Sequence, residues 1–154
     1  MASIINLEGL EAYRAAREMR REFSRFCRTL PKEETYRLKD QIVRSTRSVT
    51  ANIAEGFGRH HHQENSQFCR QARGSLVETL DHLSVALDEN YLDEEAYEKL
   101  RGLIEHAWKV LNGYIAYLQR CAREGVPSPD ARRAEKSNQQ LGNQATRQPS
   151  TIDS

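Results

Sequence analysis

The residues SVTANIAEGFGR, at positions 48–59, are typical of the last turns of a helix that packs against a protein core. Val49, Ile53 and Gly56 follow one another at intervals of four and three residues, which is the spacing of one helical face. Gly56 and Gly58 then supply the left-handed backbone geometry that commonly ends a helix. This stretch therefore predicts a buried helix that stops at the two glycines.

The same apolar repeat recurs in three further segments, and no segment shows the strict alternation of a half-buried strand. We expect helices over residues 7–30, 33–57, 63–90 and 94–123. Their connections are short, and short connections force neighbouring helices to run antiparallel. The predicted fold is therefore all-α, an antiparallel up-down-up-down four-helix bundle in a single domain, residues 1–125.

The clearest repeat lies in the last predicted helix, where a heptad predicts coiled-coil-like packing. Its members are Ala96, Leu100, Leu103, Ala107, Val110, Tyr114, Tyr117 and Cys121. We expect these residues, Tyr114 and Tyr117 included, to lie in the core. Trp108 lies one position past Ala107 and is the better candidate for an oligomer contact, because aromatic residues are enriched at interfaces.

The rest of the chain argues for a reduced, aqueous environment. Residues 126–154 are rich in Gln, Asn, Ser and Pro and contain no aromatic residue, so we expect a disordered polar tail there. No run of about 18 apolar residues and no signal peptide is present, which predicts a cytoplasmic protein without membrane contact. Cys27, Cys69 and Cys121 lack C-x-x-C spacing and are expected to be reduced, packed thiols.

A second, polar stripe follows the predicted helix 33–57 beside its apolar face. Its members, at intervals of four and three, are Gln41, Ser45, Ser48, Asn52 and Glu55. Small uncharged residues at this spacing indicate close helix packing, either internal or between subunits. We interpret the stripe as a hydrogen-bonded seam, so loss of Asn52 or Glu55 is expected to destabilise the protein by about 1–3 kcal/mol. A ligand-binding or catalytic use of Asn52 and Glu55 is the alternative.

Charge is unevenly divided along the chain. Residues 1–62 carry 12 Lys and Arg against 8 Asp and Glu, whereas residues 63–125 carry 7 against 11. The candidate basic surface on the first two helices consists of Arg14, Arg17, Arg21, Arg25, Arg28, Lys39, Arg44 and Arg47. Two interpretations of this surface stay open. Its arginines contact nucleic-acid phosphates, or they form a solvated helix face on which they pair with Glu residues three or four positions away.

Patterns of known catalytic and metal sites are missing. We find no Glu-x-x-His pair of a di-iron bundle, no G-x-S-x-G elbow and no P-loop. The adjacent residues His60, His61 and His62 point in different directions in a turn, which indicates a polar loop rather than a metal site. We therefore expect a protein that is not an enzyme and has no catalytic residue, metal or cofactor.

The segment PKEETYRLKDQIVRSTRSVTANIAEGFGR, residues 31–59, closely resembles the signature of the 23S rRNA intervening-sequence proteins. The motif residues that we single out are Gln41, Ser48, Asn52, Ile53, Glu55 and Gly56. The resemblance covers about residues 7–122 and implies a four-helix bundle that assembles as a homo-oligomeric ring, commonly a homopentamer. Thr50 stands where the family usually has proline, and Val43 replaces a common basic residue.

Distant relatives of this bundle act as accessory proteins to reverse transcriptases. The resemblance therefore implies RNA, or an RNA-associated protein such as a reverse transcriptase, as a partner. Our leading hypothesis is a non-catalytic, oligomeric, RNA-associated accessory protein that uses the arginines of its first two helices. The alternative is an oligomeric protein–protein interaction scaffold without direct nucleic-acid binding.

Overall fold

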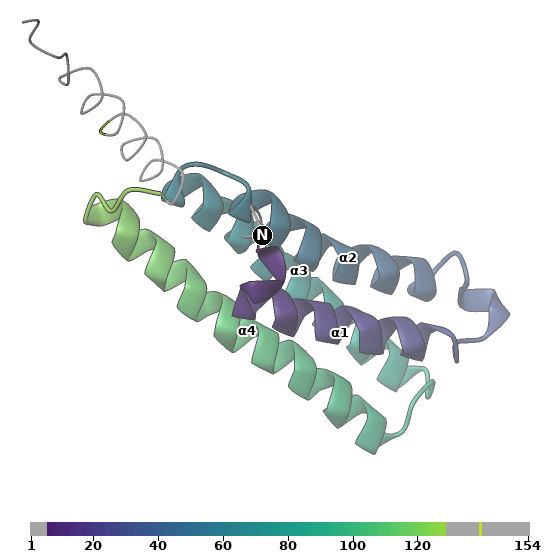
Figure 1. Cartoon of the computed structure of the whole chain (residues 1–154). Helices are drawn as coiled ribbons and strands as arrows, with labels where there is room; N and C mark the ends of the chain where they lie inside the picture. Colours follow the sequence, from purple (N-terminus) through teal and green to yellow (C-terminus); the bar gives the residue numbers. More distant parts are fainter. Residues whose placement is uncertain (1–5, 129–138, 140–154) are drawn as a thin grey trace, which may run out of the picture.

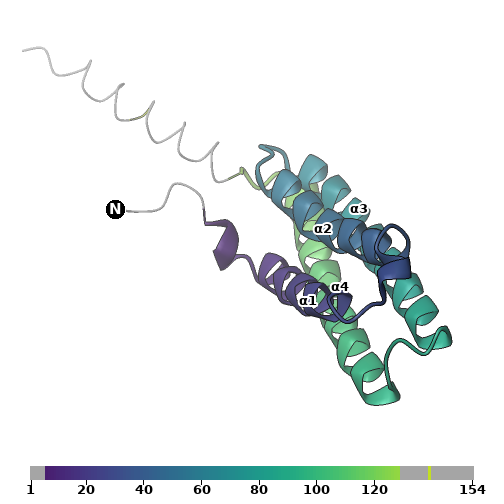
Figure 2. The ribbon, with the colours of Figure 1, turned by 90° about the vertical axis from the view of Figure 1, so that its right-hand side faces the viewer.

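The computed structural model describes residues 6–128 and residue 139, and it confirms an all-α fold of four packed helices (Figure 1). The helices are α1 (Glu11–Cys27), α2 (Leu38–Phe57), α3 (His62–Asp88) and α4 (Glu94–Arg123). Short 3-10 helices, η1 (Leu7–Gly9) and η2 (Lys32–Glu34), precede α1 and α2. Each helix packs against the next, and α4 also packs against α1, which closes the bundle (Figure 2).

The core consists of large apolar side chains from all four helices. Fully buried examples are Met19, Phe23, Ile42, Val49, Ile53, Leu76, Leu83, Leu111 and Leu118. Burial of each such side chain stabilises the fold by about 1.5–3 kcal/mol. All three cysteines are free and buried, as expected. Burial raises the pKa of the Cys27 thiol to about 11 and that of the Cys69 thiol to about 12.

The first two helices are shorter than the predicted ranges 7–30 and 33–57. Before α1, the Asn6 side chain accepts a hydrogen bond of 3.0 Å from the Gly9 N–H and holds a 3-10 turn. Before α2, the carboxylate of Glu34 accepts a hydrogen bond of 3.1 Å from the Leu38 N–H. Both side chains satisfy backbone donors locally and so compete with continuous helix.

The two later helices lie close to their predicted ranges. α3 ends at Asp88, and Asn90 then adopts a left-handed φ of 58°, as a stop signal requires. α4 spans the predicted residues, and the Asp93 side chain caps it by accepting a hydrogen bond of 2.8 Å from the Ala96 N–H. Acidic and polar caps were therefore reliable signals in this half of the chain.

The heptad that we expected in α4 does not match its buried face. The residues actually buried are Leu100, Ile104, Ala107, Leu111, Ile115, Leu118 and Cys121. Three pairs among them lie eleven residues apart, which corresponds to about 3.67 residues per turn rather than the 3.5 of a heptad. Over three turns the difference rotates Tyr117 out of the core, where it is 45 % exposed, so its placement in the core was wrong.

Tyr114 remains half-buried beside α3, where its hydroxyl accepts a hydrogen bond of 3.0 Å from the Asn65 side chain. Of the helices that the structure describes, none combines the length and apolar character that a membrane-spanning segment requires. The tail that we expected to be disordered, residues 126–154, lies outside the described residues except for residues 126–128 and 139.

Candidate nucleic-acid interface

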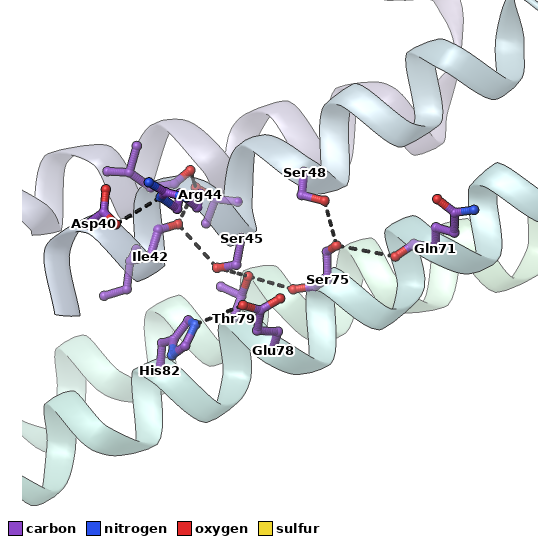
Figure 3. A network of polar contacts seen from close by, with 12 residues as sticks. Asp40, Ile42, Arg44, Ser45, Ser48, Gln71, Ser75, Glu78, Thr79 and His82 are labelled. Atoms are coloured by element: carbon purple, nitrogen blue, oxygen red, sulfur yellow. Dashed lines mark hydrogen bonds and ion pairs between the residues drawn. The ribbon is translucent and has the colours of Figure 1, made fainter. Parts of the chain in front are cut away.

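The middle of the polar stripe on α2 forms hydrogen bonds with α3 (Figure 3). The Thr79 hydroxyl donates to the Ser45 hydroxyl over 2.9 Å, and the hydroxyls of Ser48 and Ser75 lie 2.8 Å apart. Asn52 continues the stripe by donating to the Ser48 carbonyl at 2.9 Å. We call the four residues whose hydroxyls pair between α2 and α3 the hydroxyl seam: Ser45, Ser48, Ser75 and Thr79. These contacts show that the centre of the stripe packs within the chain.

The two ends of the stripe behave differently. Gln41 is exposed, and the Glu55 side chain is 53 % exposed and forms an ion pair of 2.6 Å with Arg59. Glu55 therefore does not belong to a buried hydrogen-bonded seam, and our interpretation of the stripe is wrong at this residue. A strict 4-3-4-3 stripe drifts around a straight helix by about 20° per heptad, so its ends rotate away from α3.

Part of the predicted arginine surface on α1 is neutralised by neighbours. Arg14, Arg17, Arg21 and Arg25 surround an open hollow of about 290 Å³ together with Glu18 and Glu22. Arg25 forms an ion pair with Glu22, and Arg14 donates to the carbonyl of Gly9 at 2.9 Å. These contacts agree with a solvated helix face for Arg14 and Arg25. Arg17 and Arg21 have no carboxylate partner among the described residues.

The basic residues of α2 also divide into two kinds. Arg44 is exposed and forms an ion pair of 2.9 Å with Asp40 on its own helix. Arg47 instead lines the space between α1 and α2. Lys39 is half-buried near the start of α2, and Arg28 is exposed just past the end of α1. The predicted basic residues therefore do not converge on one site.

A groove between α1 and α2 brings together residues that the sequence did not connect. It consists of two adjoining hollows of about 150 and 440 Å³, and both are lined by Arg20 and Arg47. The wider hollow is also lined by Tyr13, Thr50, Ala51 and Ala54. We call this feature the α1–α2 groove.

Arg20 and Arg47, the two arginines that line both hollows of the α1–α2 groove, form no ion pair with a described residue. Arg20 is half-buried and donates a hydrogen bond of 2.8 Å from Nη1 to the hydroxyl of Thr50, which is 3 % exposed. Within residues 6–128, neither Arg20 nor Arg47 lies within ion-pair distance of a carboxylate. The guanidinium of Arg20 is thus fixed by a neutral group and keeps its other donors for an anion.

Sequence reasoning missed Arg20 and Tyr13. Tyr13 directly follows the core residue Ala12, and Arg20 directly follows the core residue Met19, seven positions later. Positions that flank a core stripe face the adjacent helix, which was the available signal. The stronger 14–17–21–25–28 row of arginines obscured it.

A separate surface on α3 and α4 carries exposed aromatic and apolar groups. Trp108 is 39 % exposed, and the Arg73 guanidinium lies 5.8 Å from its ring centroid. Arg73 is held in place by a hydrogen bond of 2.9 Å from Nη1 to Asn112. Val77 and Val85 are exposed on α3. We call the pair Trp108 and Arg73 the α3–α4 face.

The histidine run lies where α3 begins. His62 is the first residue of α3, and its Nε2 lies 3.0 Å from the Val126 carbonyl. Within the part of the chain that the structure describes, no three His, Cys, Asp or Glu side chains converge as metal ligands would.

Comparison with known proteins identifies the family to which the chain belongs. The model of the 23S rRNA-intervening sequence protein family matches residues 8–113. The chain belongs to this family. A similar fold occurs in the crystal structure of a protein of unknown function from the S23 ribosomal protein family of Bacteroides thetaiotaomicron. The two are 22% identical, the match covers 68% of this chain and 97% of that chain, and the TM-score is 0.63. Among curated proteins, none matches the chain.

In this 23S rRNA-intervening sequence protein, two residues of the family motif have clear packing roles. Ile53 is fully buried in the core. Gly56 lies against the start of α3, where an added Cβ would come within 2.7 Å of Asn65 Oδ1 and 3.0 Å of the Phe68 Cβ. The left-handed backbone that we expected at Gly56 and Gly58 is not present, because Gly58 has a φ of −77° and Gly56 still belongs to α2. Thr50, which replaces the usual proline, is the residue that orients Arg20, and α2 is continuous through it.

Proposed function

We propose that this chain is a non-catalytic, cytoplasmic accessory protein that binds RNA through the arginines of the α1–α2 groove and the adjoining Arg17 and Arg21 of α1. We further propose that its bundle, antiparallel in up-down-up-down order, is the unit of a homo-oligomeric ring, most simply a homopentamer. The observation that carries the RNA proposal is the pair of groove arginines, Arg20 and Arg47, without a described carboxylate partner. Arginine forks suit phosphate because they present several donors in one plane.

RNA is the polyanion that the surroundings of the groove favour. Arg21 lines the narrow end of the α1–α2 groove and also the open hollow on α1, so it connects the groove to Arg17. The arginines therefore form a continuous row from the groove to the outer face of α1, along which an RNA backbone can bind. The family is named after an intervening sequence of 23S rRNA, which makes RNA the first polyanion to test.

A binding titration at two salt concentrations tests this proposal. Labelled structured RNA that contains unpaired loops is titrated at about 50 and 200 mM salt, and phosphate-led binding weakens steeply between them. Arg20→Gln with Arg47→Gln removes two phosphate contacts, so the slope of log K against log salt falls by about 1.4–1.8. Arg44→Gln is the matched control, because Asp40 already pairs with that guanidinium. Absence of binding near 50 mM salt would overturn the proposal.

The α3–α4 face favours a second candidate function, a protein–protein interaction scaffold. Trp and Arg dominate the energetics of protein interfaces, and Arg73 holds the exposed Trp108 ring in place. The partner is a second copy of this chain or an RNA-associated protein such as a reverse transcriptase.

Light scattering tests the oligomer that both candidate functions require, and the RNA titration then separates the two candidates. A mass near 17.7 kDa, that of one chain, would contradict the ring. If the protein is oligomeric, Trp108→Ser is expected to lower the mass, whereas Tyr36→Ser, at a position 92 % exposed on another part of the bundle, serves as the control. Oligomers that fail to bind RNA would favour the scaffold.

A further inference from the structure

The wider part of the α1–α2 groove contains an aromatic ring beside its two arginines. Tyr13 is half-buried and packs against the core, so its ring has little freedom to move. Across the groove, the small residues Ala51 and Ala54 of α2 line the same hollow of about 440 Å³. The open hollow on α1 and the narrower part of the groove are lined by arginines without an aromatic residue.

We propose that this part of the groove holds one unpaired nucleotide of RNA, with its base stacked on Tyr13 and its phosphate on Arg20 and Arg47. The inference rests on the proposed RNA-binding function and adds to it a substrate class, single-stranded RNA. Bases stack on aromatic side chains without regard to sequence, because each base has a π-face. The groove therefore selects for unpaired structure and not for a particular base.

The geometry of α1 separates the two parts of this site. Tyr13 and Arg20 are seven residues apart, which places them on the same side of the helix about 10 Å from each other. Thr50 fixes Arg20 from the α2 side through one of the five guanidinium donors, so the other donors are available to a ligand. Within the α1–α2 groove, a base can therefore stack on Tyr13 while its phosphate binds Arg20.

A duplex cannot use this arrangement. In an A-form helix the phosphates are accessible, but the faces of the bases are covered by their neighbours in the stack. Duplex RNA is therefore limited to the outer arginines of α1, such as Arg17 and Arg21, which contact phosphate alone. Tyr13 is the residue that distinguishes the two substrates.

The test compares single-stranded and duplex RNA of the same length. An unstructured oligouridine of about 12 nucleotides, and a G·C-rich RNA duplex of the same length that stays paired at low salt, are titrated separately against the full chain at about 50 mM salt. Tyr13→Leu is expected to weaken oligouridine binding by about tenfold, whereas Tyr13→Phe retains the ring and the affinity. Duplex binding changes by less than about twofold in both variants.

Thermal unfolding and light scattering show whether each variant keeps the fold and the mass of the parent chain. If Tyr13→Leu is less stable than the parent, Ala51→Leu provides a second probe, because it fills the groove from an exposed position on α2. Equal loss of single-strand and duplex binding in these variants, or no loss at all, would overturn this inference while the proposed function stands. Failure of the parent chain to bind either RNA would overturn both.

Discussion

The Thr79 hydroxyl of α3 donates a hydrogen bond of 2.9 Å to the Ser45 hydroxyl of α2, and both side chains are buried. Ser45 in turn donates to the carbonyl of Ile42 at 3.3 Å. Thr79→Val keeps the shape of the side chain but removes the donor, so we expect a loss of about 1–2 kcal/mol in the free energy of unfolding. Urea unfolding measures the change.

A double variant isolates this hydrogen bond from other effects. Ser45→Ala with Thr79→Val removes both hydroxyls and leaves neither unpaired, so its cost is expected to be about 0.5–1 kcal/mol smaller than the sum of the single costs. Strict additivity of the two substitutions would show that the seam contributes nothing at this point.

Asn52 and Glu55 are expected to respond differently to substitution, although they lie on the same predicted stripe. Asn52 donates to both the carbonyl and the hydroxyl of Ser48, at 2.9 and 3.1 Å. Asn52→Leu is expected to cost about 0.5–1.5 kcal/mol. Glu55→Ala should change stability by less than about 0.5 kcal/mol, because its ion pair with Arg59 is exposed to solvent. Similar costs for both variants, measured by denaturant unfolding, would contradict the distinction.

Gly56 and Gly74 give opposite predictions for the same change to alanine. At Gly56 the new Cβ would meet Asn65 at 2.7 Å, which forces α2 and α3 apart and costs about 1–3 kcal/mol despite the better helix propensity. At Gly74 nothing lies within 4 Å, so propensity alone acts and alanine stabilises by up to about 1 kcal/mol. Thermal unfolding of the two variants should therefore shift in opposite directions.

Acid stability should depend on the contact between Glu34 and Tyr91. The Leu38 N–H, followed by the Tyr91 hydroxyl at 2.9 Å, holds the pKa of the Glu34 carboxyl below its usual value. The stabilisation that the ionised Glu34 carboxylate gains from these hydrogen bonds is fully present above its unfolded-state pKa of about 4.3. It is lost as the pH falls through the lower pKa that Glu34 has in the folded state. Tyr91→Phe should therefore lose less stability than the parent between about pH 5 and pH 3.

Tyr97→Phe is the control for this pH dependence. The Tyr97 hydroxyl accepts a hydrogen bond of 3.0 Å from Arg101 and has no contact with Glu34 among the hydrogen bonds of the described residues. Unfolding followed by circular dichroism at each pH gives both profiles. An unchanged acid profile in Tyr91→Phe would argue against the proposed linkage.

Helix existence was predictable from the sequence, but the exact buried face of a long helix was not. Apolar spacing locates α4, and Asp93 marks its start. A sequence of 30 residues fits both a seven-residue and an eleven-residue repeat over short windows, and only the packing against α1 and α3 chooses between them. Tyr117 was misplaced for that reason.

The candidate site was less accessible to sequence reasoning than the fold. Counting arginines finds the outer row of α1, but it does not show which of them already have a partner, as Arg25 does in Glu22. The pairing of Arg20 with Thr50 joins residues 30 positions apart, and no local pattern contains that distance. Unpaired charge in a groove is a property of tertiary structure.

Because the helices differ in length, the local stability of the bundle differs along its axis. α1 extends about 25 Å, whereas α4 extends about 45 Å. Figure 1 shows α4 continuing beyond the start of α1, whose first residues lie beside Val110 and Tyr114. Past that level the last turns of α4 are supported by fewer neighbouring helices. Amide hydrogens there should exchange through local opening, while those between Leu100 and Leu111 exchange only when the whole domain unfolds.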